Sequence, residues 1–142
     1  MGNISKNFSF TEFEHSVKAE KNGINNSIPE QVKPAIRALV LSILQPLRDY
    51  LRVPIIIESG YRCERLNELV GGAKNSQHRK GQASDIRSVF FTPLSIARRI
   101  VALQLPFDQL ILYSTFVHVS HKVDGNQRGQ ILYDKSYKGE KI

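Results

Sequence analysis

An apolar stripe between residues 29 and 51 constrains the fold of this chain more than any other feature. Its members recur at the three- and four-residue spacing of one helix face: Val32, Ile36, Leu39, Val40, Ile43, Leu44 and Leu47. The pattern predicts a long helix over residues 29–51 with one buried face. Pro29 suits a first helical turn, Pro34 lies near enough to the start to be tolerated, and Pro46 predicts a kink toward the C-terminal end.

Shorter helices are predicted on both sides of this stripe. Residues 8–21 open with Ser9 and Glu12 at the spacing of a capping box and continue with apolar residues at helical intervals. The patterns over residues 63–70 and 93–103 also favour helices.

Five short segments are typical of strands, because they are rich in β-branched residues or alternate in polarity. They are residues 53–58, 83–87, 108–113, 116–121 and 130–133. Helices therefore dominate the first half and strands the second. We predict an α+β fold in which N-terminal helices pack on a small antiparallel sheet, within a single domain over residues 1–142.

Composition is that of an ordinary globular protein. The chain has 142 residues, of which 41% are hydrophobic and 23% charged, and this favours one domain with one core. No segment approaches the roughly 18 apolar residues of a membrane span. The first six residues lack the apolar stretch of a secretory signal, so we expect synthesis in the cytoplasm. The sequence does not determine the oligomeric state, for which a monomer is the expectation.

The net charge of +7 favours a polyanionic partner, either nucleic acid or an anionic cell wall. The basic residues are scattered in pairs such as Arg79-Lys80 and Arg98-Arg99, with no aromatic-interleaved stripe, and this disfavours nucleic acid. Cys63 is the single cysteine, which excludes an internal disulfide framework and a multi-thiolate metal site. Any metal must therefore be bound by histidine and carboxylate ligands.

The first candidate ligands are His78 and Asp85. They stand seven residues apart on either side of Gly81, which allows a sharp turn, and small residues at 83 and 84 allow close approach as the chain enters a strand. This arrangement is able to bring one nitrogen and one oxygen to a common metal ion.

His118 is the candidate for a third ligand. Strand alternation places His118 and His121 on opposite faces, and the apolar neighbours of His118 indicate a half-buried imidazole that needs a metal or a hydrogen-bond partner. Two histidines and one carboxylate leave a fourth zinc position open for water, as in catalytic zinc sites.

Several segments together resemble one protein family. They are Ser-Gly-Tyr-Arg at residues 59–62, the run over residues 66–78, Gly-Gln-Ala-Ser-Asp-Ile at 81–86, residues 107–111 and Val-His-Val-Ser at 117–120. They closely resemble the zinc D-alanyl-D-alanine carboxypeptidase family of metallopeptidases, in the group that contains related phage endolysins. The resemblance spans about residues 8 to 133.

The resemblance implies roles for individual residues. The family's Zn²⁺ ligands fall on His78, Asp85 and His118. Its arginine, which steadies the substrate carbonyl or carboxylate, falls on Arg62, whose guanidinium offers a charged planar fork of donors. Ser76 matches a position near the substrate, although an ordinary loop residue is an equal interpretation.

The sequence departs from the family pattern at Thr115. The family usually has an acidic general base three residues before the last zinc histidine, and threonine does not accept a proton from water near neutral pH as a carboxylate does. Asp108 is the nearest acidic candidate, with a strand-end carboxylate as the alternative interpretation, and His121 is a further candidate.

The expected function is that of a zinc peptidase acting on peptidoglycan stem or cross-link peptides, as a D-Ala-D-Ala carboxypeptidase or an endopeptidase of the endolysin type. Phage or prophage origin, with release to the cell wall through a phage-made membrane lesion, fits this expectation. Two alternatives stay open. One is a catalytically silent zinc protein that binds cell-wall peptide, and the other is a basic accessory protein that binds nucleic acid.

Overall fold

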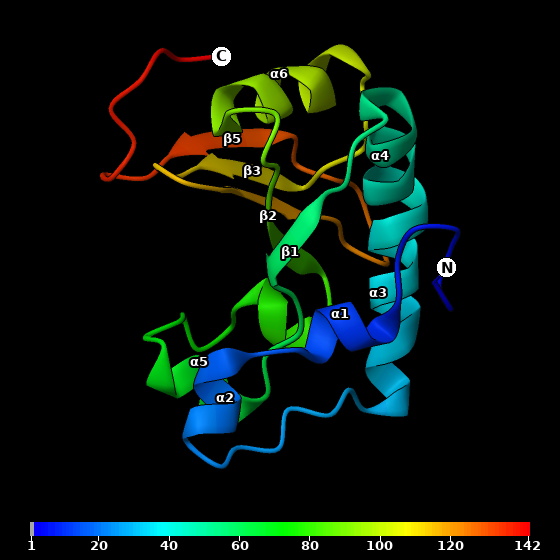
Figure 1. Ribbon diagram of the computed structural model, residues 1–142, viewed down its shortest axis with the longest axis vertical. Coiled ribbons are helices and arrows are strands. Elements are labelled where there is room, and N and C mark those ends of the chain that lie inside the picture. Colours follow the sequence, from blue (N-terminus) through cyan, green and yellow to red (C-terminus); the bar gives the residue numbers. More distant parts are fainter. Residues whose placement is uncertain (1) are drawn as a thin grey trace.

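The apolar stripe forms one continuous helical column in the computed structural model, which describes residues 2–142 (Figure 1). A single 3₁₀ turn, Glu30–Val32, leads into α3 (Lys33–Leu39). A π-helical segment (Val40–Leu44) then leads into α4 (Gln45–Leu51). The long helix predicted over residues 29–51 is confirmed, and its stripe residues from Ile36 to Leu47 are fully buried.

Pro46 changes this helix by widening one turn. The backbone N–H of Gln45 bonds to the carbonyl of Val40, five residues earlier, where an α-helix would use a residue four back. Proline has no N–H and its ring clashes with a carbonyl of the preceding turn, and a π turn relieves that clash. The distortion predicted at Pro46 is therefore a π turn, and α3 and α4 stay in line (Figure 1).

The five strands form one sheet in the order β1-β2-β4-β3-β5. Their bounds are β1 Ile56–Ser59, β2 Ala83–Arg87, β3 Gln109–Leu112, β4 Val117–Ser120 and β5 Gln130–Tyr133. The first four pair antiparallel, as predicted, but β5 pairs parallel to β3. The prediction of a purely antiparallel sheet was wrong at this strand. The neighbouring position beside β4 is already taken by β2, so the chain returns past β4 to the far side of β3.

One face of the sheet packs against the helices. Ile86, Val117 and Val119 of the central strands are fully buried on that face. They meet α3, α4 and α6 (Pro93–Ala102), which contributes Ile96, Ala97 and Ile100 to the same cluster. Burying each large aliphatic side chain contributes about 1.5–3 kcal/mol. Because strand residues alternate, Asp85 and His118 necessarily face the other way.

The helix predicted over residues 8–21 is divided in two. α1 covers Phe10–Glu14 and α2 covers Val17–Lys21, with an extended backbone at His15 and Ser16. The Ser16 hydroxyl accepts a hydrogen bond from the N–H of Ala19 at 3.1 Å and so begins a new helix. The predicted capping-box contact is present, since the Ser9 N–H donates to Glu12 Oε1 at 2.9 Å.

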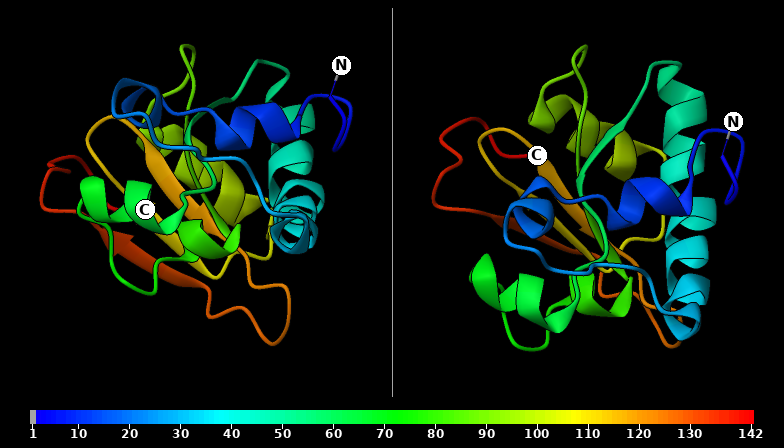
Figure 2. Two further views of the ribbon diagram at one scale, coloured as in Figure 1. Left: turned by 90° about the horizontal axis from the view of Figure 1, so that it is seen from below. Right: turned by 60° about the horizontal axis from the view of Figure 1, so that its bottom comes forward.

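The short helices gather at one end of the sheet. α1, α2 and α5 (Glu64–Leu69) lie around the end of β1 that leads to Gly60 (Figures 1 and 2). Among residues 2–142, none of the helices has both the length and the apolar character needed to cross a membrane. The helix-covered face of the sheet thus holds the core, and the short helices surround the end where the candidate ligands lie.

Candidate metal centre

The structure brings His78, Asp85 and His118 together. Asp85 Oδ1 lies 3.3 Å from His78 Nε2 and 3.0 Å from His118 Nδ1. One possible ligand atom from each residue lies within 4.8 Å of the other two, and within residues 2–142 no other group of three such side chains does so. The three side chains are 3%, 9% and 12% exposed, so they form a mostly buried cluster.

Backbone pairing places two members of the cluster. Asp85 on β2 stands directly opposite His118 on β4, so their side chains share one face of the sheet. His78 comes from a short 3₁₀ helix (Gln77–Lys80) that ends at Gly81 with a φ of +73°. A Cβ at Gly81 would also lie 2.6 Å from the Val32 side chain. Glycine is required here for both the left-handed turn and the close packing on the long helix.

Hydrogen bonding orients the His78 ring. Its Nδ1 lies 2.8 Å from the carbonyl oxygen of Gly60, which only accepts, so the Nδ1–H donates and Nε2 carries the lone pair in the neutral ring. Burial lowers the pKa of His78, although the Asp85 carboxylate opposes this shift. A neutral imidazole held by a backbone carbonyl is the arrangement common in metal-ligating histidines.

Asp85 is ionised at the centre of the cluster. Burial by itself would raise the pKa of this carboxyl, but the hydrogen bond with His118 and the nearby His78 imidazole lower the pKa well below its ordinary value. With the proton of His78 on Nδ1, the lone pair of its Nε2 faces a carboxylate oxygen. Two electron-pair donors at this separation repel one another unless a cation lies between them.

The donor set fits a tetrahedral divalent metal. Ligand atoms about 2.0–2.2 Å from a tetrahedral zinc ion are separated from one another by roughly 3.3–3.6 Å. The 3.3 Å between His78 Nε2 and Asp85 Oδ1 lies in this range, and the 3.0 Å between His118 Nδ1 and Asp85 Oδ1 is slightly shorter, at hydrogen-bond distance. Two imidazole nitrogens and one carboxylate oxygen are ligands typical of zinc, and three protein ligands are typical of a catalytic site. These residues therefore fit the metal that the sequence implies.

Arg62 borders the cluster through the second oxygen of Asp85. Its Nη2 lies 3.5 Å from Asp85 Oδ2, its Nε donates to Ser59 Oγ at 3.1 Å, and its Nη1 donates to Asn67 Oδ1 at 3.2 Å. Burial lowers the pKa of Arg62 and the Asp85 carboxylate raises it, so the guanidinium stays charged at neutral pH. Three separate contacts hold the planar fork in one orientation.

The comparison with protein families agrees with this geometry. The model of a family described as Peptidase M15 matches residues 6–120, which includes all three clustered residues and Arg62. The chain belongs to the peptidase M15 family. No curated protein matches it.

Asn67 and Gly72 support the arginine of this M15 centre, a role that sequence analysis missed. Asn67 is 2% exposed, accepts from Arg62 and donates through Nδ2 to the carbonyl of Ala73 at 2.8 Å. A Cβ at Gly72 would lie 2.1 Å from Asn67 Oδ1 and 3.0 Å from Arg62 Nη1. The signal available was an asparagine within the helix predicted over residues 63–70, followed by the Gly71-Gly72 pair.

Ser76 positions the backbone of the metal-binding segment. Its Oγ accepts the N–H of His78 at 3.2 Å and caps the 3₁₀ helix. This capping contact is a sufficient reason for a serine at position 76, whether or not the residue contacts a substrate. A contact between Ser76 and substrate stays a prediction.

Asp108 lies outside the cluster. Its side chain is fully buried, and both carboxylate oxygens accept hydrogen bonds from Arg128, the shortest at 2.6 Å. Gln77 donates to it at 3.1 Å, which links Asp108 to the residue before His78. These contacts, led by the Arg128 hydrogen bond, hold the pKa of Asp108 well below its ordinary value. The arrangement favours the strand-end alternative over a general base.

We expect Asp108→Asn to destabilise the fold by about 2 kcal/mol at pH 7, less than for a fully enclosed ion pair because Arg128 is half exposed. Because the pKa of Asp108 is lowered in the folded state, the ionised carboxylate stabilises the wild-type fold above about pH 4, and this stabilisation is lost as the pH falls further. Urea unfolding at pH 7 and pH 3 measures both effects. Asp124→Asn, at an exposed turn, is the control, and equal losses for the two variants would contradict the role of Asp108.

The position of the family's acidic residue lies in the turn between β3 and β4. Thr115 is exposed there, and the Tyr113 N–H donates to the Phe116 carbonyl at 3.0 Å, which closes the predicted two-residue hairpin. The rings of Tyr113 and Phe116 stack with centroids 4.3 Å apart. Burial raises the pKa of Tyr113, the Asp85 carboxylate raises it further, and Arg62 lowers it. Tyr113 is therefore protonated near neutral pH and close enough to Asp85 and Arg62 for their charges to affect it, and sequence analysis did not identify it.

Proposed function

We propose that this chain is a zinc-dependent peptidase that hydrolyses peptide bonds in peptidoglycan stem or cross-link peptides, as a D-Ala-D-Ala carboxypeptidase or an endopeptidase. The convergence of His78, Asp85 and His118 beside Arg62 is the observation that carries this proposal. Membership of the peptidase M15 family supports the reaction class.

The protein's own residues prepare the reaction in three ways. When bound, a divalent metal supplies Lewis acidity toward water and toward a peptide carbonyl. Asp85 and the two histidines would hold that metal, and the Gly60 carbonyl keeps the His78 lone pair directed at it. Arg62, fixed by Ser59 and Asn67, is placed to donate to the oxygen that becomes negative during hydrolysis.

A digest of defined peptidoglycan fragments tests the proposal. Zinc-loaded protein is incubated with stem and cross-linked fragments, and the products are identified by mass spectrometry. We expect one peptide bond to be cleaved, and the mass of the product identifies that bond. Absence of any product, with His78→Ala behaving in the same way, would overturn the proposed function.

Thr115 favours a second candidate, a zinc protein that binds cell-wall peptide without cutting it. Under our proposal the wild-type protein hydrolyses the peptide. Thr115→Glu should then raise kcat by about 10- to 100-fold, because a carboxylate is a better proton acceptor than a hydroxyl. Thr115→Gln is the matched control, since it has the same shape without the charge. Turnover by the Glu variant alone would favour the silent protein.

A further inference from the structure

The outer edge of β1 borders a cavity that is lined in part by Arg62, a neighbour of the metal centre. β1 is an edge strand of the sheet, paired with β2 on one side only. A cavity of about 580 Å³ is lined by Ile57, Ser59 and Arg62 on one side and by Lys18 and Lys21 of α2 on the other. Arg62 also lies 3.5 Å from Asp85, so this cavity adjoins the candidate metal centre through the arginine.

Backbone groups of β1 are free along this edge. The His121 N–H donates to the Gln82 carbonyl at 2.8 Å, which extends the hydrogen-bonded pairing of β2 with β4. Every second residue of β2 bonds to β4 in such a ladder, so the backbone groups of Ile86 point toward β4, and those of the residues on either side of it point toward β1. Ile57 stands opposite Ile86, and its own N–H and carbonyl therefore point away from the sheet. Within residues 2–142 these two groups make no backbone hydrogen bond outside the sheet.

A second hollow continues the same edge toward the start of the strand. It measures about 350 Å³ and lies between Ile55–Ile57 and the residues Thr11, Glu12 and His15. His15 lines both hollows, so together they follow the whole exposed edge of β1. This length suits a peptide in extended conformation, which gains main-chain hydrogen bonds by pairing with a free strand edge.

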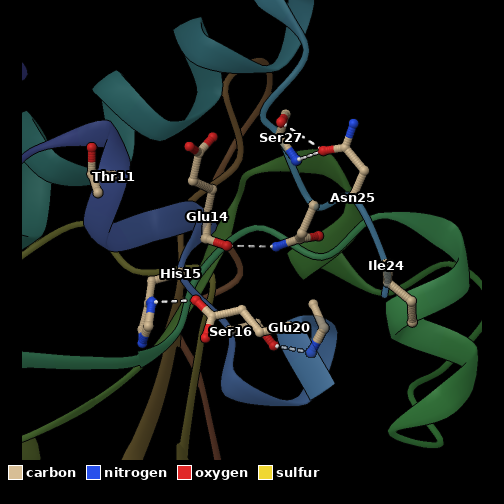
Figure 3. A pocket seen from close by; sticks show the side chains of 10 residues that line it. Thr11, Glu14, His15, Ser16, Glu20, Ile24, Asn25 and Ser27 are labelled. Carbon is tan, nitrogen blue, oxygen red and sulfur yellow. Dashed lines mark hydrogen bonds and ion pairs between the residues drawn. The ribbon is translucent and has the colours of Figure 1, made fainter. Parts of the chain in front are cut away.

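The cavity beside α2 has an excess of positive charge. Lys18, Lys21 and Arg62 all line it. Glu58, the acidic residue that lines this cavity, is paired with Arg87, whereas Glu20, 3.6 Å from His15 (Figure 3), lines a different hollow. Lys18 and Lys21 make no ion pair within the described chain from residue 2 onward. Charge complementarity therefore favours an acidic peptide.

We propose that the substrate peptide binds as an added strand on the outer edge of β1, with one of its carboxylates held by Lys18 and Lys21. Exposed apolar side chains, Val17 at 54% and Val70 at 42%, would contact its small aliphatic groups. The inference rests on the proposed function, because the peptide bond that enters the metal centre is the one to be cut. It adds the substrate class, an extended acidic peptide, and the residues that select it.

Binding measurements test the charged contact. The probe is a stem-type peptide with a free side-chain carboxylate and a reduced, uncleavable amide at the scissile position, together with its carboxamide analogue. We expect Lys18→Glu combined with Lys21→Glu to weaken binding of the acidic probe to the zinc-loaded protein by about tenfold and to leave the analogue unaffected. Lys135→Glu combined with Lys138→Glu makes the same change in net charge on the C-terminal segment and serves as control. Equal weakening by both pairs would overturn the inference.

Hydrogen exchange at Ile57 tests the strand pairing. The bound probe should slow exchange of the Ile57 amide, and methylation of the probe's backbone nitrogens should remove that protection and weaken binding. A probe that binds while Ile57 and the α2 lysine variants are unaffected overturns the inference, even if hydrolysis occurs. Protection at Ile57 with lysine-dependent binding, but no cleavage of natural fragments, overturns the proposed hydrolase and leaves the binding mode standing.

Discussion

Replacing His78 with alanine is expected to lower kcat/KM for peptide hydrolysis by about 10³-fold or more and to weaken metal binding by at least roughly 10²-fold. His78 contributes one of three protein ligands, and its ring is already oriented by the Gly60 carbonyl. Two ligands remain in the variant, but the metal ion loses one bond to the protein and the fixed position that three ligands give it. Metal content after dialysis and product formation from peptidoglycan fragments measure the two effects separately.

His121→Ala is the matched control for this experiment. His121 follows β4, is half-buried, and its Nδ1 bonds to the carbonyl of Pro106 on the side away from Asp85. It should retain the metal and most of the activity. If His121→Ala lost the metal while His78→Ala kept it, the assignment of the centre would be wrong.

Replacing Arg62 with lysine should lower kcat by about 10²- to 10³-fold, the loss typical for removal of one donor to a developing oxyanion. Lysine keeps the charge but lacks the planar fork that Ser59, Asn67 and Asp85 hold in place. The transition state should lose more than the ground state, so KM should change less than kcat. Steady-state kinetics with a defined fragment gives both constants.

Arg65→Lys on the exposed side of α5 is the control for Arg62→Lys. It makes the same chemical change three residues away and should leave kcat unchanged. Metal content should be normal in both variants, because neither arginine is a candidate ligand. A normal kcat for Arg62→Lys would exclude a role for the guanidinium in the reaction.

Local patterns in the sequence predicted most of the helices and strands. The stripe over residues 29–51 became the central helix, and β2 and β5 have the predicted bounds. These predictions succeed because burial of one helix face or one strand face imposes a period that is visible in the residues themselves. The alternation around His118 likewise placed its imidazole on the face opposite the core.

Other features depend on competition between segments that no local pattern describes. β5 lies beside β3 because β2 occupies the place beside β4, and it runs parallel to β3 because the chain leaves β4 at the end where β3 begins. The predicted helix over residues 8–21 divides at Ser16, because the serine hydroxyl accepts a backbone N–H and so caps the start of a second helix. Pro46 widens a turn without bending the helix away, because its neighbours are held in the core.

The sequence alone determined which side chains could meet at a metal, since His78, Asp85 and His118 stand in a pattern that is specific in its spacing and context. Only the tertiary structure decided how they are used. In the folded chain the His78 Nδ1–H donates to the Gly60 carbonyl, and Arg62 is hydrogen-bonded to Asn67. Asp108 is paired with Arg128, and the outer edge of β1 has no partner strand among the described residues. The physical reason is that ligand identity is a property of side chains, whereas orientation, protonation and access depend on neighbours that are distant in the chain and brought close by folding.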